Sequence, residues 1–420
     1  MPVPPTPSCG DLCLLTVHAH PDDEASKGAP TCALYAARGV RTVLVCCTGG
    51  EEGDVSNPRL LAPGQTFHGL DEAAVRAVLP RVRARELADA AEVIGFSRVA
   101  MLGYRDSGMA GSPANANPGC FHVADPDEAA GRLVALIREE RPQVMITYSD
   151  DQSGYPHPDH LKVHHISLLA FDRAGDPLWY PHLGPPWQPQ KLYYSVWTRR
   201  RLQAVHEAML RLRGASPFSE GWLARMNDDH RVTTRIEVGE SLWARTRALL
   251  AHQTQVDPAS PFWFGLSDEE LRQVYPFEDW MLARSHVPLA ARAEGDYECD
   301  LFAGVRDSSG GGHESCRHRK LARVEVADHM DASWHMEETL SEETRAEVLA
   351  LLDRLEVELG REPIDASFRR RIAHGRAGRH WLRRDCDGPT GYAFATPSAP
   401  PMVEAAGGGL DDGLVDALLD

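Results

Sequence analysis

The 420 residues of the chain, 43% hydrophobic and 25% charged, predict a globular protein of about two domains. The formal net charge of -17 argues against nucleic acid or an anionic membrane as a partner, because both bind clustered Lys and Arg. The chain has no apolar run long enough to cross a bilayer, and its nine scattered cysteines form no CxxC pair, which together predict a protein of the reduced cytoplasm.

The first third of the chain alternates short apolar runs with helical patterns. Strands are expected over residues 12–17, 41–47, 98–102 and 143–148, and helices over 27–38, 81–94 and 127–140. This βαβα alternation predicts an α/β fold with a Rossmann-like, mostly parallel sheet and helices on both faces. In such sheets ligands bind beyond the carboxyl ends of the strands.

The rest of the chain is less regular. Residues 161–307 mix helical patterns, over 198–212 and 242–252, with Pro-rich and Trp-rich connections. We expect them to complete a first domain, 1–307, and to wall its pocket. A Gly/Ser stretch at 308–313 predicts a linker. A small α/β extension is predicted over residues 314–420, with a helix over 342–359 and one or two strands within 381–395.

Two polar segments follow predicted strands and contain the residues suited to chemistry. HAHPDDE covers 18–24 and GYPHPDH covers 154–160. Each contains an i, i+3 pair, His20 with Asp23 and His157 with His160, and such pairs point the same way on a turn of helix. Two imidazoles and a carboxylate suit Zn²⁺ and leave a position open for water, as in catalytic metal sites. Asp22 is then the candidate for the carboxylate that takes a proton from water.

The HPDDE and HPDH elements resemble the LmbE-like, or PIG-L, superfamily of zinc-dependent deacetylases that act on N-acylglucosamine units. Segments at 17–31, 48–50, 106–108, 187–194, 251–257 and 300–307 are similar to the mycothiol S-conjugate amidase branch of that superfamily. The resemblance implies hydrolysis of the amide between glucosaminyl-inositol and the acylated cysteine of a small thiol-sugar conjugate. Such a reaction serves detoxification or the processing of a mycothiol-tagged intermediate, as in antibiotic biosynthesis.

The resemblance also implies roles for single residues. Zn²⁺, or Fe²⁺ in its place, would be held by His20, Asp23 and His160. Asp22 would be the general base and His157 would protonate the leaving amine. Tyr155 and His157 would stabilise the oxyanion. Asp159 would support the adjacent histidines.

Four substrate contacts are implied in the same way: Lys27, Arg83, Asp106 and Met109. In the amidase branch a lysine at the position of Lys27 is associated with preference for the conjugate over the plain N-acetyl substrate. The alternative for Arg83 is a helix-surface ion pair with Glu86. The chain departs from the family at Glu52, where a cation is expected, and this predicts altered recognition near the pocket rim.

Several other functions remain open at this point. A deacetylase of N-acetylglucosaminyl-inositol needs the same metal site and differs only in its acyl pocket. Two histidines and one carboxylate also describe the iron(II) oxygenases, although the βαβ pattern disfavours their fold. A binding protein without activity is a third alternative. The extension faintly resembles an acetyltransferase of the GNAT type, but no glycine-rich loop for acetyl-CoA precedes a helix there.

Overall fold

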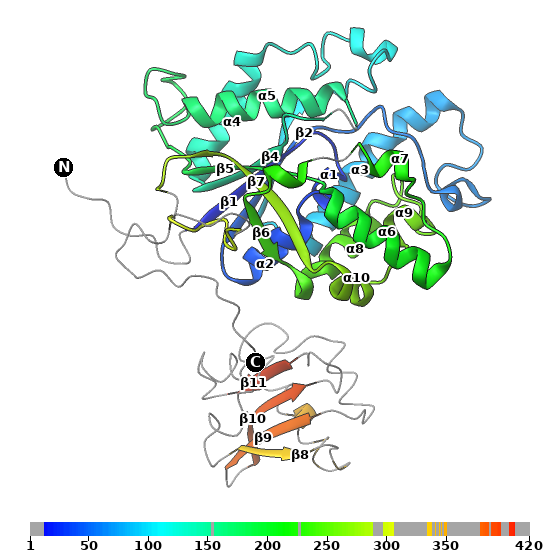
Figure 1. Ribbon diagram of the computed structural model, residues 1–420, viewed down its shortest axis with the longest axis vertical. Helices are drawn as coiled ribbons and strands as arrows, with labels where there is room; N and C mark the ends of the chain where they lie inside the picture. Colours follow the sequence, from blue (N-terminus) through cyan, green and yellow to red (C-terminus); the bar gives the residue numbers. More distant parts are fainter. Residues whose placement is uncertain are drawn as a thin grey trace, which may run out of the picture. The chain divides into compact units, whose positions relative to one another are not determined.

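The computed structural model describes residues 12–152, 155–225, 228–288 and 297–305, with short described segments between 334 and 407. The chain divides into two compact units, Met1–Ser315 and Cys316–Asp420 (Figure 1). The predicted linker at 308–313 lies outside the described residues. The domain bounds of 1–307 and 314–420 therefore stay predictions.

The first unit is built on a seven-stranded sheet in the order β3-β2-β1-β4-β5-β7-β6. Its strands are β1 (Cys13–His18), β2 (Arg41–Thr48), β3 (Arg98–Tyr104), β4 (Val144–Tyr148), β5 (Lys191–Ser195), β6 (Thr234–Glu237) and β7 (Phe277–Ser285). Neighbours from β3 to β5 are parallel, while β7 and β6 add an antiparallel edge. The prediction of a mostly parallel α/β sheet is confirmed.

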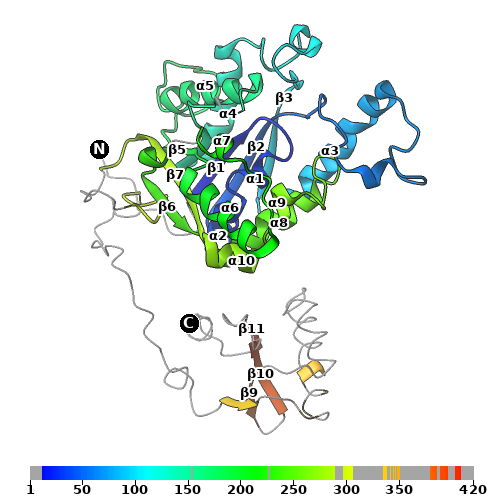
Figure 2. The same ribbon diagram turned by 45° about the vertical axis from the view of Figure 1, so that its right-hand side comes forward.

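Helices cover both faces of this sheet, as the sequence predicts (Figures 1 and 2). The bounds are α1 (Asp23–Ser26), α2 (Ala29–Ala37), α3 (Glu72–Ile94), α4 (Pro126–Glu140), α5 (Pro158–Arg173), α6 (Arg199–Arg213), α7 (Glu220–Leu223), α8 (Leu242–Ala251), α9 (Pro261–Phe264) and α10 (Asp268–Val274). Leu15 and Val17 of β1 pack in one core with α4 and α5. Leu14 packs in a second core with α2, α3 and α8. Because β1 is buried on both faces, its sequence is continuously apolar rather than alternating.

One helix differs from its prediction. The helix expected over 81–94 begins at Glu72, where Asp71 caps it by accepting a hydrogen bond from the Ala74 N–H at 2.8 Å. It continues through Pro80 and ends at Gly95, whose φ is 89°. The predicted start at residue 81 was wrong because Pro80 lies in the interior of α3. A proline has no N–H donor and is more typical of the first turn of a helix, so its position in the sequence indicated a helix start. The longer helix α3 packs against α8.

The strand order places a topological switch point between β1 and β4. From β1 the chain runs outward through β2 and β3, and it then returns to the other side of β1 to form β4 and β5. The connections leaving the carboxyl ends of β1 and β4 therefore diverge and leave a crevice there. The two polar segments identified in the sequence follow these two strands.

The described part of the second unit is a four-stranded antiparallel sheet in the order β11-β10-β9-β8. Its strands are β8 (Trp334–Glu337), β9 (Arg379–Asp385), β10 (Gly388–Ala395) and β11 (Val403–Gly407). The strands predicted within 381–395 correspond to β9 and β10, and the helix predicted over 342–359 lies largely outside the described residues.

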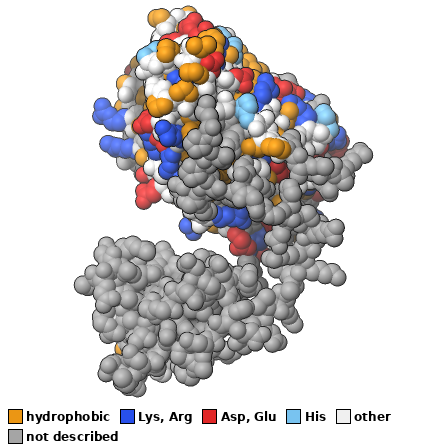
Figure 3. Space-filling view, turned by 90° about the vertical axis from the view of Figure 1, so that its left-hand side faces the viewer, with side chains coloured by type: hydrophobic (Ala, Val, Ile, Leu, Met, Phe, Trp, Pro, Cys, Tyr) orange, Lys and Arg blue, Asp and Glu red, His pale blue; other side chains and the backbone are white. Residues whose placement is uncertain are grey.

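Two properties of the molecule concern its surroundings. No helix within the described ranges combines the length and the apolar character needed to span a bilayer. On the face of the first unit seen in Figure 3, basic and acidic side chains are interspersed. The described surface on that face is therefore a mixture of both charges rather than an area of one sign.

Candidate functional site

A cavity of about 660 Å³ opens where the parallel strands end, and residues following β1, β2, β3, β4 and β5 all line it. The middle region contributes residues between 195 and 263, so it walls the pocket as expected. All of the predicted site residues line this cavity except Asp159, which is fully buried. The sequence therefore predicted the location of the pocket correctly.

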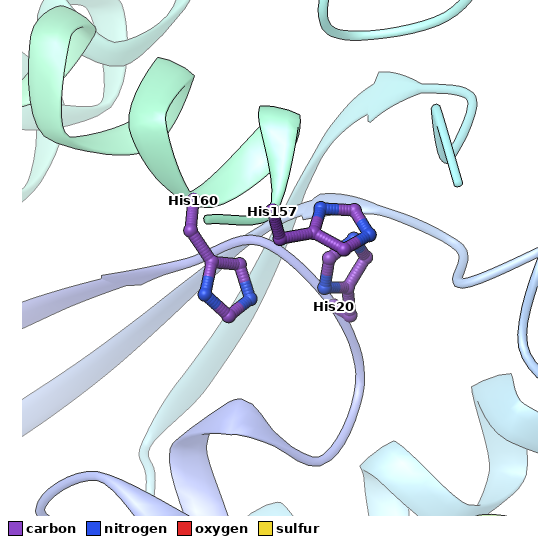
Figure 4. Close-up of side chains that lie close together, drawn as sticks. All are labelled: His20, His157 and His160. Carbon is purple, nitrogen blue, oxygen red and sulfur yellow. The ribbon is translucent and has the colours of Figure 1, made fainter. Parts of the chain in front are cut away.

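Three of the predicted site residues converge at the floor of the cavity. Asp23 Oδ2 lies 3.3 Å from His20 Nδ1 and 3.4 Å from His160 Nε2. Figure 4 shows His20 coming from the loop after β1, while His157 and His160 come from the start of α5. Potential ligand atoms of these three histidines lie within 4.8 Å of one another. His20 forms a second such group with the carboxylates of Asp106 and Asp159. Asp23 lies near both His20 and His160, but these three residues are not one of the two groups whose ligand atoms all lie within 4.8 Å of one another.

A turn before α1 and the start of α5 bring these side chains together. Asp22 has a φ of 112°, and the Asp23 N–H donates to the His20 carbonyl at 3.3 Å, which closes the turn. His157 precedes α5 as its N-cap, with extended φ and ψ of -73° and 130°. The prediction of i, i+3 pairs on helical turns is wrong for His20 and Asp23, whereas His157 and His160 do lie at the N-cap and in the first turn of α5.

Asp159 fixes the orientation of His20. Asp159 Oδ2 lies 3.2 Å from His20 Nε2 and accepts a hydrogen bond from the Ser107 N–H at 2.9 Å. The Ser107 hydroxyl donates to the other carboxylate oxygen. When His20 Nε2 carries a proton for this contact, its Nδ1 lone pair is free on the side of Asp23.

His157 is held in one tautomer by the helix that it caps. Its Nδ1 accepts a hydrogen bond from the Asp159 N–H at 3.2 Å. A neutral His157 therefore carries its proton on Nε2, because Nδ1 supplies a lone pair. The ring of Tyr155 stacks near it, with 6.0 Å between ring centroids, and Tyr155 is 55% exposed. An N–H donor and a phenol hydroxyl thus both line the cavity.

Arg83 lies against Asp22 instead of on the helix surface. Arg83 is 2% exposed, and its Nη2 lies 2.9 Å from Asp22 Oδ2. The guanidinium also donates to the carbonyl oxygens of Pro21 at 2.5 Å and Gly50 at 2.6 Å. Partial burial raises the pKa of Asp22, Arg83 lowers it, and the net shift is upward. The surface ion pair with Glu86 that was the alternative for Arg83 is wrong, because Glu86 accepts from Thr254.

The other predicted substrate contacts differ in exposure. Lys27 Nζ lies 2.5 Å from Asp23 Oδ1 and 5.4 Å from the centroid of the Tyr148 ring. Asp106 is 3% exposed and its Oδ1 lies 3.4 Å from His20 Nε2, whereas Met109 is 48% exposed. Both line the cavity. Their roles toward a substrate stay predictions.

Glu52, the departure from the family pattern, is neutralised by two arginines. Its carboxylate oxygens lie 2.6 Å from Arg76 Nη1 and 2.6 Å from Arg105 Nη2. Its backbone N–H donates to Asp106 Oδ2 at 3.2 Å. The acidic residue therefore joins an ion-pair network at the rim rather than presenting an isolated negative charge to the cavity.

The sequence reasoning missed a buried pair behind the turn. Glu24 Oε1 lies 2.5 Å from His252 Nε2, both side chains are fully buried, and Glu24 Oε2 accepts the Asp22 N–H at 2.9 Å. Glu24 thus helps to hold the turn that positions Asp22. The third acidic residue of HPDDE and a histidine at the end of an apolar helical pattern were the available signals.

The arrangement defines a class of protein: an α/β enzyme with a cluster of histidines and carboxylates that could hold a metal at its switch point. The family description PIG-L: GlcNAc-PI de-N-acetylase matches residues 15–171. Mycothiol S-conjugate amidase of Streptomyces coelicolor is 41% identical over 307 residues, which cover 71% of this chain and 99% of the relative. The chain belongs to the PIG-L family, and it is a hydrolase.

Deacetylases are similar to the same degree. The 1D-myo-inositol 2-acetamido-2-deoxy-alpha-D-glucopyranoside deacetylase of Thermobifida fusca is 41% identical over 303 residues, covering 70% of this chain and 99% of the relative. Among solved structures, the N,N'-diacetylchitobiose deacetylase of Pyrococcus horikoshii covers 64% of this chain and 83% of its own, at 15% identity and a TM-score of 0.44. The relatives at 41% identity thus include both an amidase and a deacetylase.

Proposed function

We propose that the first domain, 1–307, is a metal-dependent amidase of mycothiol S-conjugates. It would cut the amide between glucosaminyl-inositol and the acylated cysteine. The observation that carries this proposal is the cavity, in which Asp22, His157 and the cluster of His20, Asp23 and His160 face one space of about 660 Å³. The sugar and inositol of either candidate substrate would occupy part of that space, and its aromatic side is the part that favours a large acyl group.

The proposed metal is Zn²⁺, with Fe²⁺ as an alternative, held by His20, Asp23 and His160. The donor types suit these ions, and Asp23 Oδ2 lies within 3.4 Å of a nitrogen from each histidine. Burial lowers the pKa of His160 to about 4, although Asp23 opposes this shift, so the imidazole is neutral and its lone pair is available at pH 7. When bound, such an ion polarises the amide carbonyl and acidifies water.

The residues of this chain would then divide the proton transfers between them. Asp22 accepts a proton from water while the water oxygen attacks the amide carbon. His157 Nε2–H and the Tyr155 hydroxyl donate toward the carbonyl oxygen as it gains negative charge. As the C–N bond breaks, His157 relays to the nitrogen the proton that Asp22 took from water, so that both side chains return to their starting protonation states. The products are the free amine of glucosaminyl-inositol and the carboxylic acid of an N-acetylcysteine thioether.

A second candidate function is deacetylation of N-acetylglucosaminyl-inositol. The deacetylase of Thermobifida fusca supports it, because it matches this chain at the same identity as the amidase does. The chemistry is unchanged, and only the acyl group differs. The apolar side of the cavity, described below, favours the amidase.

The two functions are separated by parallel assays. Zinc-loaded protein is incubated with the bimane conjugate of mycothiol and with N-acetylglucosaminyl-inositol, and the free amine released from each is measured. We expect a higher kcat/KM for the conjugate. A higher value for the acetylated sugar would establish the deacetylase instead, and cleavage of neither substrate would contradict both proposals.

The role of Asp22 is tested by Asp22→Asn, which keeps the shape of the side chain and an acceptor for Arg83. We expect kcat to fall by about 10² to 10⁴, the usual contribution of a general base. Zinc content, measured by elemental analysis, should remain that of the wild type. Asp89→Asn, on the exposed face of α3, is the matched control and should keep full turnover. Near-normal turnover of Asp22→Asn would exclude the proposed base.

A further inference from the structure

One side of the cavity is lined by half-buried aromatic rings. We call these rings the aromatic wall; its members are Trp197, Trp222, Phe262 and Trp263. Trp197 follows the carboxyl end of β5, Trp222 lies in α7, and Phe262 and Trp263 lie in α9. Three separate segments therefore deliver large apolar side chains to the space that also contains the metal cluster.

The aromatic wall is a packed structure. Phe262 contacts the other three rings, with centroid distances of 4.7 Å to Trp263, 6.2 Å to Trp197 and 6.3 Å to Trp222. Behind Trp222, the buried ring of Phe218 stacks at 5.3 Å. Edge-to-face and stacked contacts of this kind fix the orientation of the rings. The wall therefore has a defined shape before any ligand binds.

A hydrophobic core alone does not account for these rings. Leu202, Met209, Phe218 and Leu223 form the buried part of this cluster, and the wall residues are its partly exposed members or pack beside it. Part of their remaining surface borders the cavity, and Trp197, Phe262 and Trp263 also line a second, smaller cavity of about 50 Å³. A rigid apolar surface in a concave site gains most when an apolar group of a ligand covers it.

The strand order shows which part of a conjugate would meet the wall. Asp106 follows β3, and Arg83 contacts the loop after β2, so the predicted sugar and inositol contacts lie on the β3-β2 side. The metal cluster follows β1 and β4 in the middle of the sheet. Trp197 follows β5 on the opposite side. A substrate whose amide lies at the cluster and whose sugar lies toward β3 therefore extends its cysteine toward β5.

We propose that the aromatic wall is the subsite for the S-substituent and that it selects conjugates with a large, flat, apolar group on sulfur. This inference rests on the proposed amidase function and names the class of substrate within it. Arg225 and Asp228 also line the cavity, and Asp228 is ion-paired with Arg231 at 3.2 Å. The main contacts that the wall offers are apolar and aromatic, which suit an aryl thioether better than a polar one.

The first test compares S-benzyl and S-methyl mycothiol as substrates of the wild-type protein. The two share the sugar, the inositol and the scissile amide and differ only in the group on sulfur. We expect kcat/KM to be at least about tenfold higher for the S-benzyl conjugate, since apolar pockets discriminate by this amount or more. Equal values would overturn the proposal.

The second test removes part of the wall. In Trp222→Ala and in Phe262→Leu, which retains more apolar volume, the S-benzyl to S-methyl ratio of kcat/KM should fall toward one. Trp243→Ala is the control, because Trp243 is 37% exposed and does not line the cavity; its ratio should equal that of the wild type. If the wall instead stacks against the sugar, the variants will lower both values equally, which contradicts the proposal.

A third measurement uses only the wild-type protein and follows binding instead of catalysis, so it does not depend on whether a variant folds. N-acetyl-S-benzylcysteine and N-acetyl-S-methylcysteine, the acid products, are titrated into wild-type protein, and quenching of tryptophan fluorescence is followed. We expect the benzyl compound to bind at least about tenfold more tightly. If the protein cleaves only the acetylated sugar, the amidase proposal fails; if it cleaves both conjugates equally and binds both acids equally, only the wall proposal fails.

Discussion

His20 and His160 lie in one cluster yet favour opposite protonation states. Burial alone would lower the pKa of His20, but hydrogen bonds to Asp106, Asp159 and Asp23 raise it well above its usual value. The pKa of His160 falls to about 4 through burial, which Asp23 only partly opposes. Before a metal binds, His20 is therefore the protonated member of the pair at neutral pH.

This difference predicts that metal binding releases a proton from His20. A raised pKa means that the proton is held at neutral and acidic pH, so the metal must displace it, and affinity rises with pH. For one displaced proton, the affinity of metal-free protein for Zn²⁺ should rise about tenfold per pH unit below the His20 pKa. Calorimetric titration in buffers of different ionisation enthalpy measures the protons released.

The matched variant for this measurement is Asp159→Asn. It removes one of the carboxylates that raise the pKa of His20, so fewer protons should be released at a given pH. A Zn²⁺ affinity independent of pH between about 5 and 8 would show that His20 is already neutral in the metal-free protein. His160 contributes nothing in that range because its pKa is about 4.

At the residue scale, local patterns predicted part of the site. His20, Asp23, His157 and His160 could be grouped because they lie in two short motifs that follow buried strands, and the family resemblance then implied His20, Asp23 and His160 as the ligands. The partners of these motifs could not be predicted, since they depend on the tertiary fold. Arg83 reaches Asp22 across 61 positions and His252 reaches Glu24 across 228. The hydrophobic periodicity of the sequence does not indicate contacts between residues so far apart in the chain.

At the scale of elements, the loop after β2 and helix α3 together position Asp22. Gly50 has a φ of 67°, and a Cβ atom there would overlap the guanidinium of Arg83. Arg83 in turn donates to the Gly50 carbonyl and contacts Asp22. The loop can approach α3 this closely because the residue has no side chain.

Gly50→Ala should therefore displace Arg83 and disturb Asp22. We expect kcat/KM to fall by about 100-fold, the scale associated with misplacing a catalytic group by about 1 Å. The control is Gly39→Ala, because Gly39 also has a positive φ, 76°, but has no atom near its Cβ position. Both variants should lose about 1 to 3 kcal/mol of stability through backbone strain, and only Gly50→Ala should lose activity beyond that. Equal activities would contradict the positioning role of this loop.

The sequence predicted the elements on the parallel side of the sheet better than those on the antiparallel edge. β1 and β4 are continuous apolar runs because helices cover both of their faces. β7 contains Glu278 and Asp279, which a pattern analysis assigns to a surface. Both are buried in the structure, where Glu278 accepts hydrogen bonds from the N–H and hydroxyl of Thr31 at 2.9 and 2.6 Å. A buried acid with such a distant partner cannot be predicted from periodicity.

At the scale of the whole molecule, the chain has a second unit that its amidase relative lacks. The alignment covers 99% of that relative but 71% of this chain. The first unit, Met1–Ser315, contains the described cavity and both cores. Compact units with their own cores commonly fold alone.

A chain truncated after Ser315 should consequently fold and retain hydrolysis. We expect one cooperative thermal transition, and kcat/KM within about twofold of that of the full chain, as for an independent domain. The full chain, assayed in the same preparation conditions, is the control. A truncated chain that is unfolded or inactive would show that the second unit is required by the first.

The order of functional parts along the chain has a consequence for evolution. The metal cluster, Asp22 and the predicted sugar contacts all lie within 15–171, the stretch that the family description matches, whereas the aromatic wall lies between 197 and 263. The proposed catalytic residues and the predicted contacts to the sugar and inositol come first in the sequence. The proposed contacts to the S-substituent, which varies between conjugates, come later. With the proposed roles, mutation or recombination downstream of residue 171 would retarget the enzyme to new conjugates and preserve the inherited reaction.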